Sequence, residues 1–128
     1  LLSFNFFLLV IFNNNFIYHW KNYPMPLDDV SAVNFMEGVP AFDGAPMLLK
    51  AEFDVDERCD TFVKLPGFKK GIIIVNNRVL SRHWEVGPQR SAYLPATFLR
   101  EGKNEIVVLE LEGYDKPIVF LDDEADIG

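Results

Sequence analysis

Cysteine is nearly missing from this chain, and so are clustered basic residues. Cys59 is the single cysteine among 128 residues, which excludes an internal disulfide and favours a reducing, cytoplasmic compartment. Asp and Glu number 19 against 12 Lys and Arg, and Lys69-Lys70 is the one basic pair. Nucleic-acid binding needs clustered Lys and Arg for phosphate contacts. The net charge of −7 therefore predicts no nucleic-acid partner.

Long apolar runs and helical periodicity are also lacking. The run of residues 6–12 is too short for a bilayer, which takes about 20 apolar residues, so no membrane partner is expected. No stretch sustains a 3.6-residue apolar period, which argues against packed helices. His19, His83 and Cys59 form no metal-ligand spacing. We therefore expect no metal and no cofactor.

Residues 1–18 differ from the rest of the chain. They contain no charge, Gly, Pro or Ala, and they hold five of the twelve Phe. Our hypothesis is that this segment is a truncated or mis-joined gene end, not native to the domain. The alternative is the tail of a cleaved signal or anchor, although a basic start and a small-residue cleavage site are both missing. Residues 19–128 are then the folded domain.

Short strands separated by turn residues follow. Residues 50–56 alternate strictly, with Ala51, Phe53 and Val55 on one face and charged residues on the other, as in a half-exposed strand. Further strands are expected at 61–65 and 105–111, an edge strand at 118–120 and one helical turn at 95–99. The class predicted is all-β, an antiparallel β-sandwich or jelly roll.

A hairpin is expected at residues 71–84, because Asn76-Asn77 suits a two-residue turn with positive φ. This turn pairs Val75 with Arg78, Ile74 with Val79 and Ile73 with Leu80. One face then carries Ile73, Val75, Leu80 and Trp84, and the other carries Ile72, Ile74, Val79 and His83. We expect Ile72, Ile74 and Val79 to form an apolar patch that the isolated domain leaves open. We also expect Arg78 to cover Trp84 with its stem and Arg82 to form an ion pair, either within the chain, with Glu85, Glu52 or Glu110, or with a neighbouring domain.

This hairpin and the residues around it resemble glycoside hydrolase family 35 β-galactosidases, from about Trp20 to Asp123. The matching positions are Gly71, Val75, Asn76, Leu80, Arg82, Trp84, Gly87-Pro88-Gln89, Tyr93, Pro95, Leu99, Gly102 and Asn104-Glu105-Ile106, with Pro24-Met25-Pro26-Leu27, Asp60-Thr61-Phe62 and residues 66–71 upstream. Three hairpin positions depart from the family pattern. Asn77 and Ser81 replace glycines, and His83 replaces tyrosine.

The resemblance implies a C-terminal, galactose-binding-like jelly roll of an enzyme of carbohydrate metabolism. In that family two glutamates on a separate (β/α)₈ barrel carry out the hydrolysis. We therefore assign no catalytic residue here and expect no activity from this chain alone. The leading hypothesis is a non-catalytic domain or fragment that packs against the catalytic barrel and a neighbouring β-sandwich.

The competing hypothesis is an independent carbohydrate-binding module that uses exposed aromatic rings. The candidate sugar or domain-interface contacts are Arg82, His83, Trp84 and Tyr93, and Trp20 is a further candidate for stacking on galactosides. We interpret Glu52, Asp54 and Asp56, like the acidic tail at 122–126, as solvated charges. A Ser81, His83 and Asp60 triad lacks the strand-turn-helix setting of a nucleophile.

Overall fold

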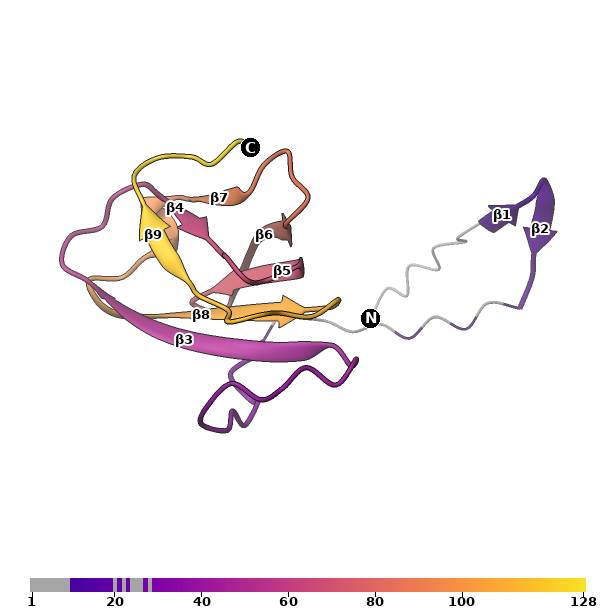
Figure 1. Ribbon diagram of the computed structural model, residues 1–128, viewed down its shortest axis with the longest axis horizontal. Coiled ribbons are helices and arrows are strands. Elements are labelled where there is room, and N and C mark those ends of the chain that lie inside the picture. The colour runs from indigo at the N-terminus through magenta and orange to yellow at the C-terminus, as the bar shows by residue number, and fades with distance from the viewer. Residues whose placement is uncertain (1–9, 20, 22, 24–26, 28) are drawn as a thin grey trace, which may run out of the picture.

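The computed structural model describes residues 10–19, 21, 23, 27 and 29–128 and is an antiparallel β-sandwich (Figure 1). Its strands are β1 Val10–Phe12, β2 Asn15–Ile17, β3 Met47–Val55, β4 Thr61–Lys64, β5 Lys70–Val75, β6 Arg78–Trp84, β7 Ser91–Leu94, β8 Gly102–Glu110 and β9 Phe120–Asp122. A 3₁₀ turn, η1, covers Ala96–Phe98. In this part of the chain no helix has the length and apolar character needed to cross a membrane.

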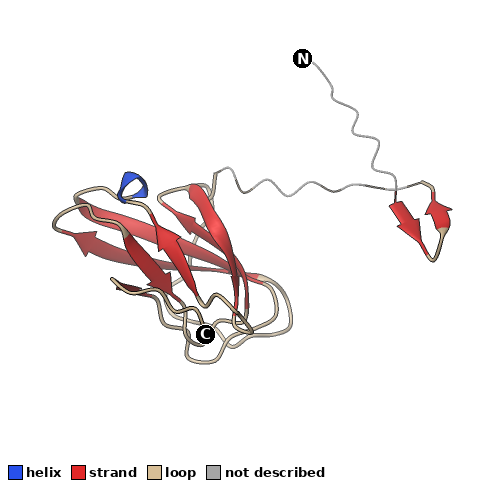
Figure 2. Cartoon of the chain, turned by 90° about the horizontal axis from the view of Figure 1, so that it is seen from above, coloured by secondary structure: helices blue, strands red, loops and turns tan. Residues whose placement is uncertain are grey.

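The sandwich consists of a four-stranded sheet, ordered β3-β8-β5-β6, and a three-stranded sheet, ordered β7-β4-β9. Every neighbouring pair of strands is antiparallel. Figure 2 shows the two sheets as layers of strands, with η1 at one end. The main core lies between them and joins Val63 and Leu94 of the smaller sheet to Ile73, Ile106 and Val108 of the larger one. The predicted fold class is confirmed.

The periodic strands of the sequence are present with small changes in their ends. β3 alternates partly buried Ala51, Phe53 and Val55 with exposed charged residues, as predicted. β9 is the expected edge strand, although it begins at Phe120 instead of residue 118. Pro95 precedes η1 as its N-cap instead of occupying the first helical position.

Strands β1 and β2 form a separate hairpin through Asn13 and Asn14, whose φ angles are 52° and 63°. They pair with each other and with neither sheet of the sandwich (Figure 1). Phe12 and Phe16 are more than half exposed. No strand of the predicted 1–18 segment therefore extends the sandwich, and residues 1–9 lie outside the described residues. That this segment is not native to the domain stays a prediction.

The β5–β6 hairpin has the predicted turn but only part of the predicted register. Asn76 and Asn77 have φ angles of 49° and 64°, and the pairs Val75–Arg78 and Ile74–Val79 form as expected. A β-bulge then shifts the register, so that Ile73 pairs with Ser81 and not with Leu80. A shift of one residue exchanges the two faces of a strand.

This shift reverses the predicted positions of Trp84 and His83. Trp84, predicted on the face of Ile73 and Val75, is 48% exposed on the outer face, whereas His83 is only 8% exposed and points to the core side. His83 pairs with Gly71, where an added Cβ would lie 1.8 Å from the Leu109 carbonyl oxygen. Only glycine allows β5 and β8 to approach so closely.

The outer face of the larger sheet is covered by the chain itself. Val30 is 3% exposed and packs against Ile74 and Val107, with partly buried hydrophobic side chains around them at Leu27, Phe35, Leu48 and Ile72. The predicted open patch is therefore wrong at Ile74, which is fully buried, and partly wrong at Ile72. Val79 remains 51% exposed.

The Asn77 side chain binds residues 29 and 30, which belong to the segment that covers the outer face of the larger sheet. Its side-chain oxygen accepts a hydrogen bond from the Val30 amide at 2.7 Å, and its amide group donates to the Asp29 carboxylate at 3.0 Å. These two bonds explain the first departure from the family pattern. A glycine would form the same turn, but it has no side chain with which to hold residues 29 and 30.

Glu110 is a polar anchor that the sequence reasoning did not identify as one. It is fully buried, and its carboxylate accepts hydrogen bonds from backbone amides on two loops. The donors are Lys69 before β5, Lys70 at its start, and Leu111, Glu112 and Gly113 after β8, at 2.9–3.3 Å. Five amides of two loops are thus satisfied by one side chain.

Candidate functional site

The predicted contact residues lie in three different places in the sandwich. Arg82 and Trp84 are exposed on the outer face of the larger sheet. His83 points inward between the sheets, and Tyr93 lies on the outer face of the smaller sheet. Trp20 lies outside the described residues. The structure therefore does not gather these residues into one aromatic platform.

The two arginines of β6 also differ from their predicted roles. Arg78 does not cover Trp84. Its guanidinium stacks 4.0 Å from the centre of the Phe98 ring and donates to the Thr97 carbonyl at 3.0 Å. Lys70 lies over Trp84 instead, 5.2 Å from the ring centre. Arg82 makes no ion pair with any described residue, so the pairing predicted within the chain is not found.

The outer face of the smaller sheet carries aromatic and charged side chains side by side. Phe62 pairs across the strands with Tyr93, and their ring centres are 5.6 Å apart. Lys64 donates to the Asp122 carboxylate at 2.6 Å and lies over the Phe120 ring. Hydrogen bonding from Lys64 lowers the pKa of the Asp122 carboxyl. On this face, the Phe62 and Tyr93 rings therefore contact each other, and the Lys64 and Asp122 charges form an ion pair with each other.

Asp60 fixes the end of this face. One carboxylate oxygen accepts the Ala96 amide at 2.9 Å, and the other accepts the Tyr93 hydroxyl at 2.6 Å. The Ala96 bond, followed by the Tyr93 bond, lowers the pKa of Asp60, and the same contact raises the pKa of Tyr93. Asp60 therefore positions η1 and Tyr93 and is not available to a catalytic triad.

Catalytic and metal chemistry find no support in the described part of the chain. The Ser81 hydroxyl is buried without any hydrogen-bond partner, so no base activates it. Glu52 is exposed and shares Lys50 with Glu105, as expected of a solvated face. No group of three His, Cys, Asp or Glu side chains among the described residues is arranged to hold a metal ion.

Many residues that carry the family resemblance have structural roles. The side chain of Asn76 donates to the Phe98 carbonyl at 2.7 Å and to the Asn104 side chain at 2.8 Å. Asn104 in turn bonds the backbone of Arg100 and Gly102. This buried network joins the β5–β6 turn to η1 and to the start of β8. The resemblance therefore identifies the fold more directly than it identifies a ligand site.

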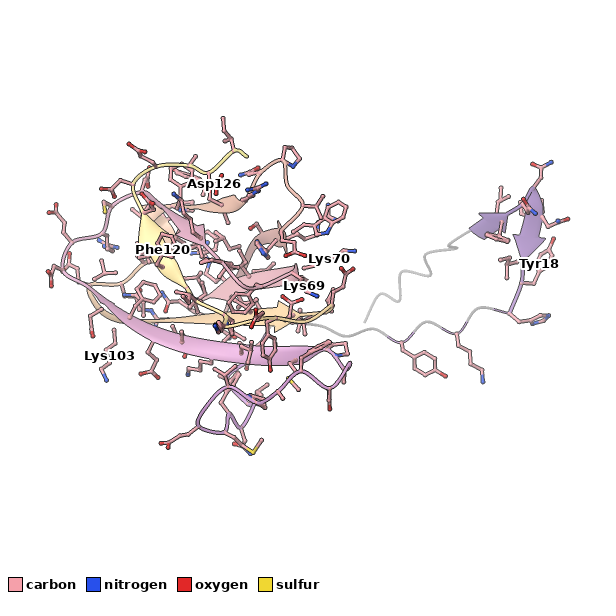
Figure 3. The ribbon with its side chains drawn as sticks, in the orientation of Figure 1. Tyr18, Lys69, Lys70, Lys103, Phe120 and Asp126 are labelled. Carbon is pink, nitrogen blue, oxygen red and sulfur yellow. The ribbon has the colours of Figure 1, made fainter. Side chains whose placement is uncertain are left out.

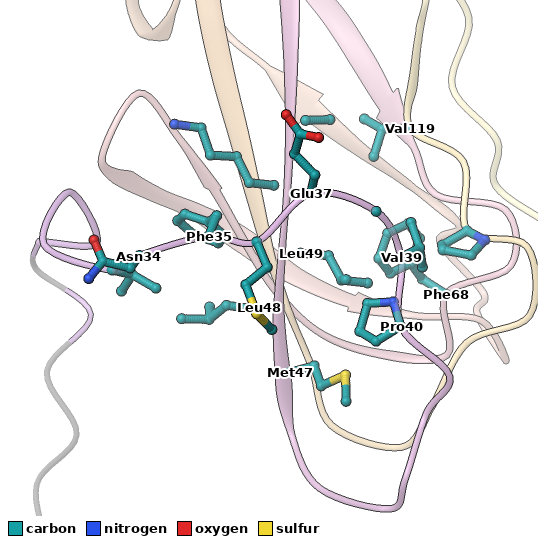
Figure 4. Close-up of a pocket in the computed structure, with 16 residues that line it drawn as sticks. Asn34, Phe35, Glu37, Val39, Pro40, Met47, Leu48, Leu49, Phe68 and Val119 are labelled. Carbon is teal, nitrogen blue, oxygen red and sulfur yellow. The ribbon is translucent and has the colours of Figure 1, made fainter.

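Two surface regions remain as candidate sites. One is the apolar flank, the surface formed by residues 33–40, β3 and residues 114–119, which surrounds two adjoining hollows. Figure 4 shows the first hollow, about 680 Å³, with Leu48, Leu49 and Phe68 among its lining residues. Met36, Val39 and Ile118 are exposed on this flank at 89%, 59% and 55%.

The other region is the end pocket, a cavity of about 290 Å³ at one end of the sandwich. Its polar lining comes from Lys64 at the end of β4, His83 and Glu85 around the end of β6, Arg90 before β7 and Asp126 in the C-terminal segment. Phe68 and Phe120 are the phenylalanines among its lining residues. Sequence reasoning did not identify Glu85, Arg90 or Phe120, because no motif links them.

Comparison with known proteins agrees with this fold. The family model described as "Beta-galactosidase, galactose-binding domain" matches residues 46–104. Beta-galactosidase 1 of Dictyostelium discoideum is 32% identical over 111 residues, which cover 79% of this chain. The mouse Beta-galactosidase-1-like protein is 32% identical over 113 residues, or 80% of the chain. Human Beta-galactosidase-1-like protein 2 is 46% identical over 52 residues, or 41% of the chain.

The matched regions are small parts of these relatives. They span 16% of the Dictyostelium protein, 18% of the mouse protein and 8% of the human protein. The sandwich core, the β5–β6 hairpin and the start of β8 all lie in or beside the segment that the family model matches. The chain therefore contains a β-sandwich of the galactose-binding domain type that occurs in β-galactosidases of glycoside hydrolase family 35.

Proposed function

We propose that this sandwich is a non-catalytic domain of a β-galactosidase-type glycoside hydrolase and that it supports the catalytic barrel by packing against it and against a neighbouring β-sandwich. Hydrolysis by such enzymes uses a pair of carboxylates that flank the scissile bond. The charged residues described above are instead solvated or bound to backbone and side-chain partners. The proposed role of this domain is therefore to stabilise the structure of a larger protein through its contacts with the other domains.

The apolar flank is the observation that carries this proposal. Residues 33–40 cross over β3 as an extended loop (Figure 4), and Val33, Met36 and Val39 stay exposed, although Phe35 is partly buried against the cluster beneath. Met36 is 89% exposed and Val39 is 59% exposed beside it, and an exposed apolar patch is more informative than a single exposed residue. The two hollows share Val39, Pro40 and Pro117, so the apolar surface is continuous. Surfaces of this kind mark contacts with other proteins or domains.

The length of the relatives supports an occupant from the same polypeptide. This chain covers less than a fifth of each relative named above, so most of the parent protein lies outside the sandwich. Contacts between domains of one chain are more polar than a core and bury about 600–1,500 Å². A flank with apolar hollows and a charged neighbour such as Glu37 suits that mixed character.

A domain exchange tests the proposal. The matching segment of the Dictyostelium enzyme is replaced by residues 21–128 of this chain, and galactoside hydrolysis and melting temperature are measured. We expect a folded chimera that hydrolyses a chromogenic galactoside, and we expect Met36→Glu with Val39→Glu to lower its melting temperature and activity. These two changes should leave the isolated domain folded, because both side chains are exposed.

Lys103→Glu is the matched control, because this exposed residue is the second of β8 and lies at the end of the sandwich away from Lys70 (Figure 3). It should leave the chimera unchanged. The proposal would be contradicted if the control and the flank variant lost equal amounts of activity and melting temperature. It would also be contradicted if neither variant changed the chimera. The isolated chain should not hydrolyse the galactoside, and turnover by it would refute a supporting role.

A further inference from the structure

The first hollow of the apolar flank lies where both hydrophobic clusters of the sandwich reach the surface. Leu49 and Phe68 in its lining belong to the core between the sheets, whereas Phe35 and Leu48 belong to the cluster on the outer face of the larger sheet. Leu48 and Leu49 are neighbours in the edge strand β3 and therefore point to opposite faces of its sheet. The hollow thus runs around the edge of β3 and meets apolar side chains from both faces (Figure 4).

Residues 33–40 form one wall of this hollow, and both ends of the wall are fixed. At its start, the Val33 amide donates to the carbonyl of the buried residue Val30 at 3.2 Å. At its other end, the Tyr114 hydroxyl donates to the Pro40 carbonyl at 2.5 Å. The hollow is therefore formed in advance, and a group that enters it does not first have to order the chain around it.

The side chains around the hollow select an apolar occupant. Among the sixteen lining residues, Asn34, Glu37 and Lys50 carry polar side chains. Lys50 is already paired with Glu105 at 2.7 Å. The opposite charges of Glu37 and Lys50 offer an anion or a cation no net attraction. The remaining side chains are hydrophobic, as in clefts that bind through apolar contact.

The size of the hollow fits more than one side chain. Its volume of about 680 Å³ lies well inside the range of binding pockets, about 300–1,000 Å³. Residues 47–51 of β3 line it, and they span about 13 Å at about 3.3 Å per residue. Alternate side chains of an extended segment lie about 6.6 Å apart and share one face. Two such side chains therefore fit next to each other along β3.

We propose that this hollow is a socket for two alternate apolar side chains of an extended segment, which belongs to another domain of the parent polypeptide. The proposal rests on the supporting role given above and specifies what the apolar flank holds. The relatives that this chain matches have more than four fifths of their length outside the matched region, so the same polypeptide can supply the segment. Met36 is 89% exposed at the hollow, and its flexible side chain can close over the occupant.

Binding of short capped peptides to the purified chain tests the socket, with ¹⁵N-detected amide shifts as the readout. The probes are the capped tripeptide Leu-Gly-Leu, capped leucine alone and the polar tripeptide Ser-Gly-Ser. We expect saturable binding of Leu-Gly-Leu in the millimolar range, with shifts centred on residues 33–40 and 47–51. Leu-Gly-Leu should bind at least about tenfold more tightly than capped leucine, because it buries a second leucine side chain. Ser-Gly-Ser should not bind.

Met36→Glu with Val39→Glu should weaken the binding of Leu-Gly-Leu by about tenfold or more, because both side chains line the hollow. Val79→Glu is the matched control, because Val79 is 51% exposed on the outer face of the larger sheet and is not among the lining residues. It should change the affinity by less than about twofold. No saturable shift with Leu-Gly-Leu up to about 50 mM would overturn the proposal, as would equal affinities for Leu-Gly-Leu and leucine.

The chimera described above separates this inference from the supporting role. If Met36→Glu with Val39→Glu impairs the chimera but the isolated chain does not bind Leu-Gly-Leu, the socket is refuted and the supporting role stands. If the isolated chain binds the peptide but the chimera is unaffected, the supporting role fails, and so does the assignment of the segment to the parent polypeptide. Dimers of the isolated chain that the double variant dissociates would assign the hollow to a second copy instead.

Discussion

Replacement of Glu110 by glutamine removes one acceptor oxygen from the interior of the sandwich. The carboxylate now accepts from five backbone amides, four through Oε1 and two through Oε2, with Lys70 shared between the oxygens. In the best orientation, the glutamine oxygen keeps the four donors of Oε1. Its NH₂ group then faces the Lys69 amide, so two donors meet without an acceptor.

The expected loss follows from this geometry. A buried donor left without a partner costs about 1–3 kcal/mol, and the bonds that remain lose the strengthening that the charge supplies. Glu110→Gln should therefore lower the free energy of unfolding by about 2–4 kcal/mol. A domain of this size has about 5–15 kcal/mol in total, so the variant should fold but with a small margin. Glu110→Ala removes an acceptor from all five amides, of which the Leu111 amide keeps its bond to the Lys70 carbonyl, and this variant should not fold.

Urea unfolding followed by far-ultraviolet circular dichroism measures this loss. With a dependence on urea of about 1–3 kcal/mol per molar, the midpoint should fall by about 1–2 M. Glu112→Gln is the control, because it removes an exposed ion pair to Lys70 that contributes at most about 1 kcal/mol. If Glu110→Gln unfolds within about 0.5 kcal/mol of the parent chain, the buried carboxylate does not anchor the two loops as argued.

Four further predictions concern the β5–β6 hairpin and the Asp60 contacts. Gly71→Ala should cost about 3 kcal/mol in urea unfolding, because its Cβ would overlap a β8 carbonyl, whereas Ser81→Ala should stabilise the chain by about 1 kcal/mol, since its hydroxyl is buried without a partner. Asn77→Gly should speed hydrogen exchange of the Val30 amide while the β5 and β8 amides stay protected. Equal exchange at Val30 would refute this tether. The pKa of Asp60 lies below its ordinary 3.8 in the folded state, so its contribution to stability is present above pH 3.8 and is lost as the pH falls through the lowered folded value. Asp60→Asn should remove that acid dependence, and matching acid unfolding curves for variant and parent would contradict it.

The strand pattern was predictable because it depends on local rules. Alternation along β3 and the Asn76-Asn77 turn require information from only a few neighbouring residues. The register next to the turn was also correct, since a two-residue turn determines the pairs beside it. The fold class follows from several such segments in succession.

The β-bulge was not predictable in this way. Ser81 stands where the family pattern has glycine, and its hydroxyl is buried without a partner, but neither fact specifies which residue is left unpaired. The position of the bulge depends on how β6 meets the rest of the sandwich, where His83 fits opposite Gly71. One unpaired residue in β6 places His83 on the inner face and Trp84 on the outer face, the reverse of the prediction. It therefore also changes which of the two side chains can contact a ligand or another domain.

The candidate sites required three-dimensional information for the same reason. Arg90 and Phe120 are 30 positions apart and belong to no common motif, yet they line one cavity. Glu110 looks like one more acidic residue near the end of a strand. Only the arrival of the β4–β5 loop on top of it shows that the carboxylate is an anchor.

The amino-acid sequence alone determined the class of fold, the turn at Asn76-Asn77 and the relationship to the galactose-binding domain family, because alternation, turn chemistry and motif spacing are local properties. The tertiary structure decided which face each β6 side chain occupies, what covers Ile74 and which groups meet at the end pocket. These outcomes depend on contacts between segments far apart in the chain. A one-residue change in pairing alters them without any change in composition or period.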